Sequence, residues 1–385
     1  MTSPNRIYLD HAATTPMLPQ VSEAMAPWVA EEFGNPSSLY AEGRRAKDAI
    51  DEARETVSQA LGCLFAEVIF TSSGTEAANL AIVGTALANE DPRRNRILFS
   101  AVEHHCVLNT APILTRLGYS VDLIPVDRIG RVRLDDFESA IGDDVLLVSV
   151  MHANNELGTL QPVAEVAKLA HTCGSFFHCD SVQTFLISEL GSRISDLAAS
   201  LITVSAHKIH GPKGVGALYV RAGTKFKPLI SGGGQEREMR GGTENVAGIV
   251  GFGAAVKAVM AMPDNRRGAR DRFLADLDIP GLQLTAPSDE ILPGHAHFGI
   301  PGVQAETMLI LLDRLGVSAS SGAACSSGSI EPSHVLVACG YSEQETKEGL
   351  RFTFGRETTE AEAIEAARRV SEAAHKLLTS GKLGS

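Results

Sequence analysis

The feature that most constrains the fold is a series of short, β-branched apolar runs that end in polar residues. Helical patterns separate several of them, for example 163–172, which has Pro162 before its start and Gly174 after its end. This alternation predicts a largely parallel sheet that is covered by helices on both faces. The predicted buried strands are Val68–Phe70, Ile97–Ser100, Val121–Pro125, Val145–Val150, Ser175–His178, Leu201–Val204 and Gly216–Val220.

The length of the chain, 385 residues, favours two or three domains rather than one. After Val246 the pattern changes from alternating strands and helices to an apolar helix, a polar stretch and a smaller α+β region. We therefore predict an α/β protein in two parts. A large domain would span residues 16–255, and a small domain would be built from residues 1–15 and 256–385.

Composition and charge argue against several classes of function. The net charge of −12 disfavours a basic face that binds nucleic acid directly. The longest apolar run, Val246–Val256, is too short to span a membrane as a helix, and the first residues lack the layout of a secretory signal. The six cysteines form no CxxC pair, and no spacing of cysteine and histidine matches a zinc site. We expect a cytoplasmic protein without a metal site.

Three of the predicted strands are followed by residues that could together hold one cofactor. The small-residue turn Thr71–Glu76 opens a helix, which favours phosphate. Asp180 could keep a pyridinium nitrogen protonated, and Lys208, if partly desolvated, could form a Schiff base. Each feature alone has a simpler explanation, such as a helix cap or a solvated lysine. Their combination predicts a site for pyridoxal 5′-phosphate.

Cys325 lies within a run of small residues, 319–329. This composition is typical of an exposed loop, in which a substrate could reach the thiol. The alternative is an inert cysteine in a tight turn.

Arg351 and Arg356 lie in a strand-like alternation of apolar and polar residues, and an arginine fork suits the carboxylate of an amino-acid substrate. For Arg356 we prefer the alternative of a surface salt bridge.

Beyond these features, the chain resembles the NifS/IscS-type cysteine desulfurases of the aminotransferase class V group. The resemblance implies a fold type I enzyme that depends on pyridoxal phosphate, forms a homodimer and passes sulfur from L-cysteine to an acceptor protein. The matching stretches are Tyr8–Pro16, Phe33–Ser38, Met151–Gly158, Gly241–Asn245 and Leu350–Thr359.

The resemblance also implies roles for the matching positions. Lys208 would carry the cofactor, and His104 would stack on its ring and take part in proton transfer. Cys325 would attack the substrate sulfur and become a persulfide, with L-alanine as co-product. The expected cofactor-binding residues are Gly74, Thr75, His104, Asp180, Gln183, Ser205, His207, Lys208 and, from the neighbouring subunit, Thr243. The residues expected to hold the substrate carboxylate are Asn155 and Arg351.

Two alternatives concern the reaction and the acceptor. Lys208 and Asp180 specify only the cofactor, so a selenocysteine lyase or another C–S lyase is the competing interpretation. The sequence around Cys325 resembles the loop of the IscS-like group and differs from the shorter loop of the SufS-like group. The chain ends soon after its last helix, whereas IscS-like proteins often continue into an arm that docks a scaffold protein. The acceptor could therefore belong to iron–sulfur cluster assembly or to a thiolation pathway.

Overall fold

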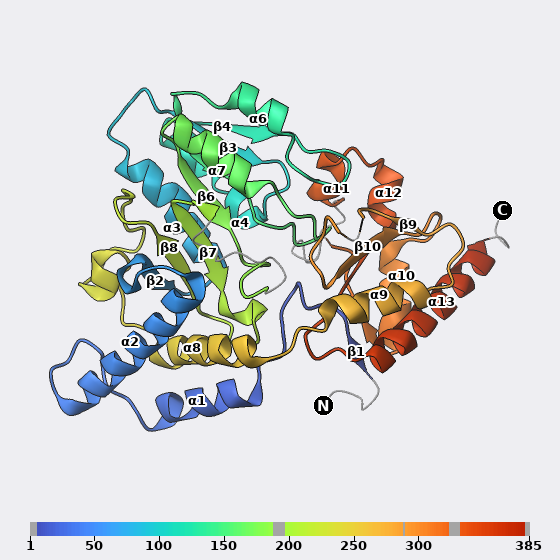
Figure 1. Ribbon diagram of the computed structural model, residues 1–385, viewed down its shortest axis with the longest axis horizontal. Helices are drawn as coiled ribbons and strands as arrows, with labels where there is room; N and C mark the ends of the chain where they lie inside the picture. Colours follow the sequence, from blue (N-terminus) through green and yellow to red (C-terminus); the bar gives the residue numbers. More distant parts are fainter. Residues whose placement is uncertain (1–5, 188–196, 288, 323–331, 382–385) are drawn as a thin grey trace.

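The computed structural model of the chain describes residues 6–187, 197–287, 289–322 and 332–381. Its elements form two groups side by side, one around a large sheet and one that contains the C-terminal helix α13 (Figure 1). The helices are α1 Pro19–Ala30, α2 Ala41–Leu61, α3 Gly74–Ala88, α4 His105–Leu108, α5 Ala111–Arg116, α6 Leu134–Ala140, α7 Val163–Thr172, α8 Val246–Ala261, α9 Arg266–Asp276, α10 Ala305–Arg314, α11 His334–Ala338, α12 Glu343–Glu348 and α13 Glu360–Gly381.

The large sheet has seven strands in the order β2-β8-β7-β6-β5-β3-β4. The strands are β2 Val68–Thr71, β3 Arg96–Ser100, β4 Ser120–Ile124, β5 Val145–Ser149, β6 Phe176–Asp180, β7 Leu201–Ser205 and β8 Gly216–Val220. The neighbours from β4 to β7 pair in parallel, while β8 runs antiparallel to both β7 and β2. The carboxyl ends of β2, β3, β5, β6 and β7 therefore meet at one edge. The predicted α/β fold with a mostly parallel sheet is confirmed.

Both faces of the large sheet are covered because its strands are apolar on both sides. In β7, Ile202 and Val204 join the core that contains Phe252 of α8, whereas Leu201 joins the core that contains Leu80 of α3. Every residue of β5 and β7 is buried, which is the pattern expected of strands in the middle of a covered parallel sheet.

The second group of elements has its own core and a smaller sheet. Its antiparallel strands have the order β12-β10-β9, and a separate parallel pair joins β1 to β11. These strands are β1 Ile7–Tyr8, β9 Gln283–Leu284, β10 His295–Gly299, β11 Val317–Ser318 and β12 Gly349–Thr353. Ile7 and Leu9, at the start of the chain, pack into this core with Phe273 and Phe352. The domain bounds 16–255 and 1–15 with 256–385 stay a prediction.

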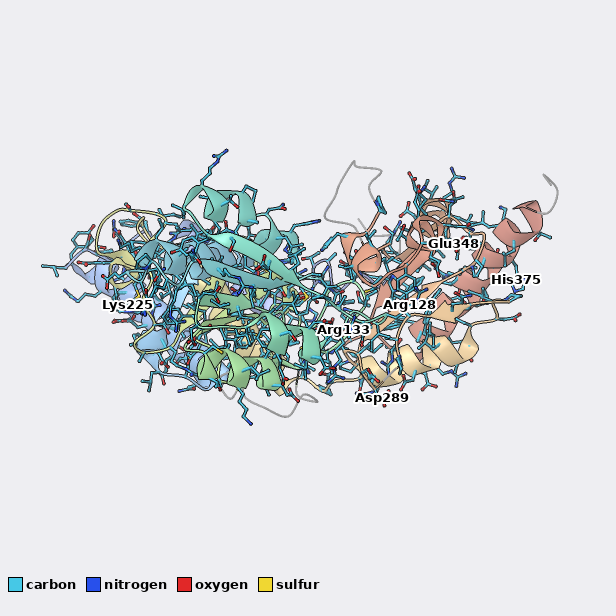
Figure 2. The ribbon with its side chains drawn as sticks, turned by 90° about the horizontal axis from the view of Figure 1, so that it is seen from above. Arg128, Arg133, Lys225, Asp289, Glu348 and His375 are labelled. Atoms are coloured by element: carbon cyan, nitrogen blue, oxygen red, sulfur yellow. The ribbon has the colours of Figure 1, made fainter. Side chains whose placement is uncertain are left out.

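Arg128 contacts the segment 340–345, from just after α11 into α12 (Figure 2). Its guanidinium donates to the carbonyl of Gly340 at 2.8 Å, pairs with Glu345 at 2.8 Å and lies 4.0 Å above the ring of Tyr341.

Within the part of the chain that the structure describes, no single helix is both long and apolar enough to cross a membrane. A bent pair, Val246–Ala261 with Arg266–Ala275, meets that test by length and composition alone.

Candidate active site

A cavity of about 360 Å³ lies at the edge where the carboxyl ends of the strands meet. It brings together every predicted site residue except Thr243 and Cys325. The predicted residues that line it are Gly74, Thr75, His104, Asn155, Asp180, Gln183, Ser205, His207, Lys208 and Arg351. Asp180 and Ser205 are the last residues of β6 and β7, so each strand extends slightly further than predicted.

The turn before α3 forms one end of the cavity. Ser73 caps the helix, and its hydroxyl accepts from the backbone N–H of Glu76 at 3.1 Å. The N–H groups of Gly74 and Thr75 precede the first intrahelical bonds and so suit an anion. A Cβ on Gly216 of β8 would lie 2.7 Å from the backbone carbon of Ser73, so only glycine lets that strand approach the turn this closely.

Asp180 is a buried carboxylate on the floor of the cavity. Burial raises the pKa of Asp180 to about 6, although a hydrogen bond from the backbone of Val182 and the positive charge of Lys208 oppose this effect. The thiol of Cys106 lies 3.9 Å from its Oδ2. A buried carboxylate of this kind is stabilised by a cationic N–H partner, which a protonated pyridine ring would supply.

Lys208 lies in a short 3₁₀ turn, Ala206–Lys208, directly after β7. Its Nζ donates to the backbone carbonyl of Ala12 and, at 2.9 Å, to that of Ala13. The side chain of Gln183 donates to the same Ala12 carbonyl at 3.0 Å. The N-terminal segment therefore orients the amine through two neutral backbone carbonyls.

His104 and His207 present neutral imidazoles to the cavity. Burial, followed by the charge of Lys208, lowers the pKa of both rings to about 4. The Nδ1 of His104 accepts from the backbone N–H of Cys106 at 3.1 Å, so its proton resides on Nε2. The Nδ1 of His207 lies 3.1 Å from the hydroxyl of Thr14.

Arg351, on β12, reaches the cavity from the second group of elements and is only 2% exposed. Its Nη2 pairs with Asp10 at 2.7 Å, and its Nη1 donates to the carbonyl of Asn155 at 2.8 Å. Its buried Nε has no hydrogen-bond partner among the described residues. An unsatisfied buried donor is costly, so this nitrogen favours a ligand that brings an acceptor such as a carboxylate.

The family is decided by a match to the model described as Aminotransferase class-V, which covers residues 7–365. The chain belongs to this family. A cysteine desulfurase IscS of Dictyoglomus turgidum is 45% identical over 359 residues, which cover 92% of this chain and 90% of that protein. A cysteine desulfurase NifS of Azotobacter vinelandii is 39% identical over 371 residues, which cover 94% and 91%.

Solved structures agree with this assignment to the class-V family. One described as a NifS-like protein has a TM-score of 0.87 and 33% identity, and the match covers 95% of this chain and 98% of that one. Another, described as SspA in complex with cysteine, has a TM-score of 0.81 and 34% identity, with 91% and 99% covered. The resemblance to NifS/IscS-type proteins is therefore confirmed, while the roles of individual residues stay predictions.

Two of the predicted site residues are not among the described residues that line the cavity. Cys325 lies outside the described residues, although Gly322, just before the undescribed segment, does line the cavity. Thr243 is exposed and does not line it, which leaves its predicted contribution to a neighbouring subunit untested. The sequence interpretation missed Asp10, which pairs with Arg351, and did not include Cys106 in the site, although Cys106 lies two residues after His104.

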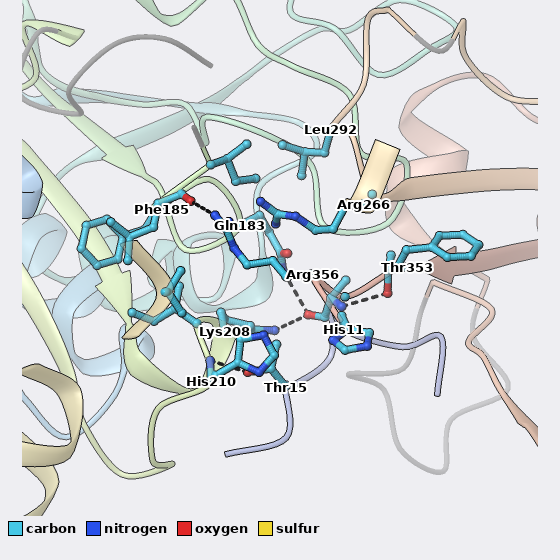
Figure 3. A pocket seen from close by; sticks show the side chains of 18 of the residues that line it. His11, Thr15, Gln183, Phe185, Lys208, His210, Arg266, Leu292, Thr353 and Arg356 are labelled. Atoms are coloured by element: carbon cyan, nitrogen blue, oxygen red, sulfur yellow. Dashed lines mark hydrogen bonds between the residues drawn. The ribbon is translucent and has the colours of Figure 1, made fainter. Parts of the chain in front are cut away.

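Arg356 lies away from this cavity, and the expectation of a surface salt bridge was wrong about its location. It is buried in a separate cavity of about 50 Å³ that also borders Lys208 (Figure 3). Its guanidinium donates to the carbonyl of Leu186 at 2.5 Å and pairs with Asp264 at 3.3 Å. The short alternating segment did not reveal that α9 and the preceding loop would cover this side chain.

Proposed function

We propose that this chain is a pyridoxal-phosphate-dependent cysteine desulfurase. It would take sulfur from L-cysteine, release L-alanine and pass the sulfur, through a persulfide on Cys325, to an acceptor protein. The observation that carries the proposal is the meeting of Lys208, Asp180 and Arg351 in one cavity. The names of the relatives, and of a structural neighbour solved with cysteine, point to the same substrate.

The residues around the cavity fit pyridoxal phosphate in their chemistry. The start of α3, with Ser205 and His207, offers neutral donors to a phosphate, Asp180 offers an anion to the ring nitrogen, and Lys208 offers an amine for covalent attachment. When bound, the cofactor supplies an electron sink for carbanion chemistry at the substrate carbon next to the carboxylate.

The remaining groups would bind the substrate and move protons. Arg351, through its unpartnered Nε, and Asn155 would hold the substrate carboxylate. His104 is neutral and carries its hydrogen on Nε2, so its imidazole would donate that hydrogen toward the reacting atoms, and the amine of Lys208 would accept and return a proton there. Cys325 would act as the nucleophile toward the substrate sulfur.

The class of acceptor, the oligomeric state and the compartment belong to the same proposal. A homodimer would allow the exposed Thr243 of one subunit to complete the phosphate site of the other. The acceptor would be a scaffold or carrier protein, and the cytoplasm suits a reduced catalytic thiol. Selenocysteine lyase is the competing reaction, and comparing turnover of cysteine and selenocysteine separates the two.

The test uses the purified chain reconstituted with pyridoxal phosphate. Borohydride reduction followed by peptide mapping should label Lys208, and L-cysteine with a thiol reductant should give alanine and sulfide in equal amounts. A label on another lysine, or no alanine from a fully loaded protein, would contradict the proposal. Cystine turnover that exceeds cysteine turnover would favour a different C–S lyase.

A further inference from the structure

Four fully buried polar side chains form a hydrogen-bonded row beneath the cavity: Glu103, Ser149, His178 and Thr203, here called the buried polar row. All four have no exposed surface. The hydroxyl of Ser149 lies 3.4 Å from Oε2 of Glu103 and 2.8 Å from Nδ1 of His178, and Nε2 of His178 lies 2.9 Å from the hydroxyl of Thr203. Oε1 of Glu103 accepts from the backbone N–H of Met151 at 2.6 Å.

The buried polar row crosses three adjacent strands of the sheet and the segment that follows a fourth. It runs from the segment after β3 through β5 and β6 to β7, which are neighbours in that order. His178 lies two residues before Asp180 on β6, and Thr203 lies two residues before Ser205 on β7. Residues two apart share a face of a strand, so the row supports these two site residues from directly below. At its other end, Glu103 is the neighbour of His104.

The hydrogen bonds of the row can run in either of two directions. With Glu103 ionised, Thr203 donates to Nε2 of His178, Nδ1–H donates to Ser149, and Ser149 donates to Glu103. With Glu103 protonated, Glu103 donates to Ser149, Ser149 donates to Nδ1, and Nε2–H donates to Thr203. The proton on the carboxyl group therefore determines which nitrogen of the imidazole carries a hydrogen.

The charges around Glu103 make both states accessible. Burial, as the largest cause, and the negative charge of Asp180 together raise the pKa of Glu103 to about 8, against the opposing effect of the hydrogen bonds that it accepts. The titratable groups that face it are Asp180, Cys179 and, through Ser149, His178 on β6, and His334 of α11, which binds its backbone carbonyl at 2.9 Å. Burial keeps His178 neutral because it lowers the pKa of the ring to about 3.

We propose that Glu103 is a positioning residue of the cofactor site, which acts through the buried polar row to fix the strand ends that carry His104, Asp180 and Ser205. The inference rests on the proposed function only in that the cavity binds pyridoxal phosphate. Glu103 does not line the cavity, and its charge state affects the site through the direction of the hydrogen bonds in the row and through its repulsion of Asp180.

The test compares Glu103→Gln with Glu103→Leu in the holoenzyme, with Glu348→Gln as the matched control. Glu348 is also a buried, hydrogen-bonded carboxylate, but it lies on α12, away from the cavity. Glutamine can still accept from Met151 and donate to Ser149, so we expect pyridoxal phosphate affinity within about threefold of wild type; leucine leaves those partners unsatisfied and should weaken it by about tenfold or more. The control should not change it.

A second readout follows the imidazole itself. Long-range ¹H–¹⁵N NMR, with His178 assigned by a His178→Gln variant, should show wild type changing from the Nε2–H to the Nδ1–H form as the pH rises. Glu103→Gln should stay in the Nε2–H form throughout, which can be measured even if Glu103→Leu does not fold.

Wild-type affinity in Glu103→Leu, or the same His178 tautomers in Glu103→Gln and wild type across the whole pH range, would overturn the inference. Cofactor affinity and the His178 tautomer are both measured without turnover. A holoenzyme that binds the cofactor normally but makes no alanine would therefore contradict the proposed function and leave the role of Glu103 standing.

Discussion

Replacing Arg351 by lysine should test the predicted contact with the substrate carboxylate. The change keeps a positive charge that can still reach Asp10, but it removes Nε, the buried donor that has no partner among the described residues. A charge-assisted hydrogen bond contributes ~1.5–3 kcal/mol, which corresponds to a loss of roughly 10- to 150-fold in kcat/KM for L-cysteine. Because the bond is made to a part of the substrate that does not react, most of the loss should appear in KM.

Steady-state alanine formation measures the effect, with Arg356→Lys as the control. Arg356 lies five residues further along, is also buried and lines the small cavity that borders Lys208, but its guanidinium binds Leu186 and Asp264 and does not line the main cavity. Cysteamine, which lacks the carboxylate, supplies a second control as a competitive inhibitor. Its inhibition constant should be the same for wild type and Arg351→Lys.

Two results would refute this reasoning. If Arg351→Lys weakened cysteamine and cysteine equally, the substitution would have disturbed the cavity rather than one contact. If KM for cysteine stayed within about threefold of wild type, the Nε donor would not reach the carboxylate.

Three further predictions concern the nucleophile, the phosphate turn and pH. Cys325→Ala should abolish alanine formation from cysteine and leave the absorbance of the bound cofactor unchanged; a variant with full activity would exclude the persulfide. Gly216→Ala places a Cβ 2.7 Å from the backbone of Ser73 and 2.9 Å from the nitrogen of Gly74, so equilibrium dialysis should show weaker cofactor binding, and unchanged binding would argue against that turn as the phosphate site. The pKa of Glu103 is raised from 4.5 to about 8, so the stability contributed by its neutral form is complete below pH 4.5 and is lost as the pH rises through about 8. Glu103→Gln should therefore melt higher than wild type at pH 9 and close to it near pH 4.5; equal melting temperatures at both pH values would show that folding does not raise the pKa of this carboxyl group.

The sequence predicted the elements well because the strands of the large sheet are continuous apolar runs bounded by turns. β8, Gly216–Val220, and α7, Val163–Thr172, match their predicted bounds. The sequence also predicted that Asp180 and Lys208 lie in one site. Each of these polar residues closely follows a buried apolar run, and the carboxyl ends of parallel strands meet at one edge of the sheet.

Contacts between distant segments could not be predicted in this way. The pairing of Asp10 with Arg351 joins residues 341 positions apart, and local periodicity carries no information about such a contact. The buried polar row was missed for a related reason. Ser149 and Thr203 resemble ordinary strand residues until the order of β5, β6 and β7 brings them into line with His178.

The hydrogen bonds from Lys208 to Ala12 and Ala13 also have a consequence for biosynthesis. Residues 7–8 and Asp10 are held by β11 and by Arg351 of β12, which are synthesised after the large sheet is complete at Val220. The nascent chain can therefore assemble its sheet early but needs β12 before the N-terminal carbonyls can orient the lysine. Stable attachment of the cofactor would then require synthesis through β12, and shorter products would remain colourless.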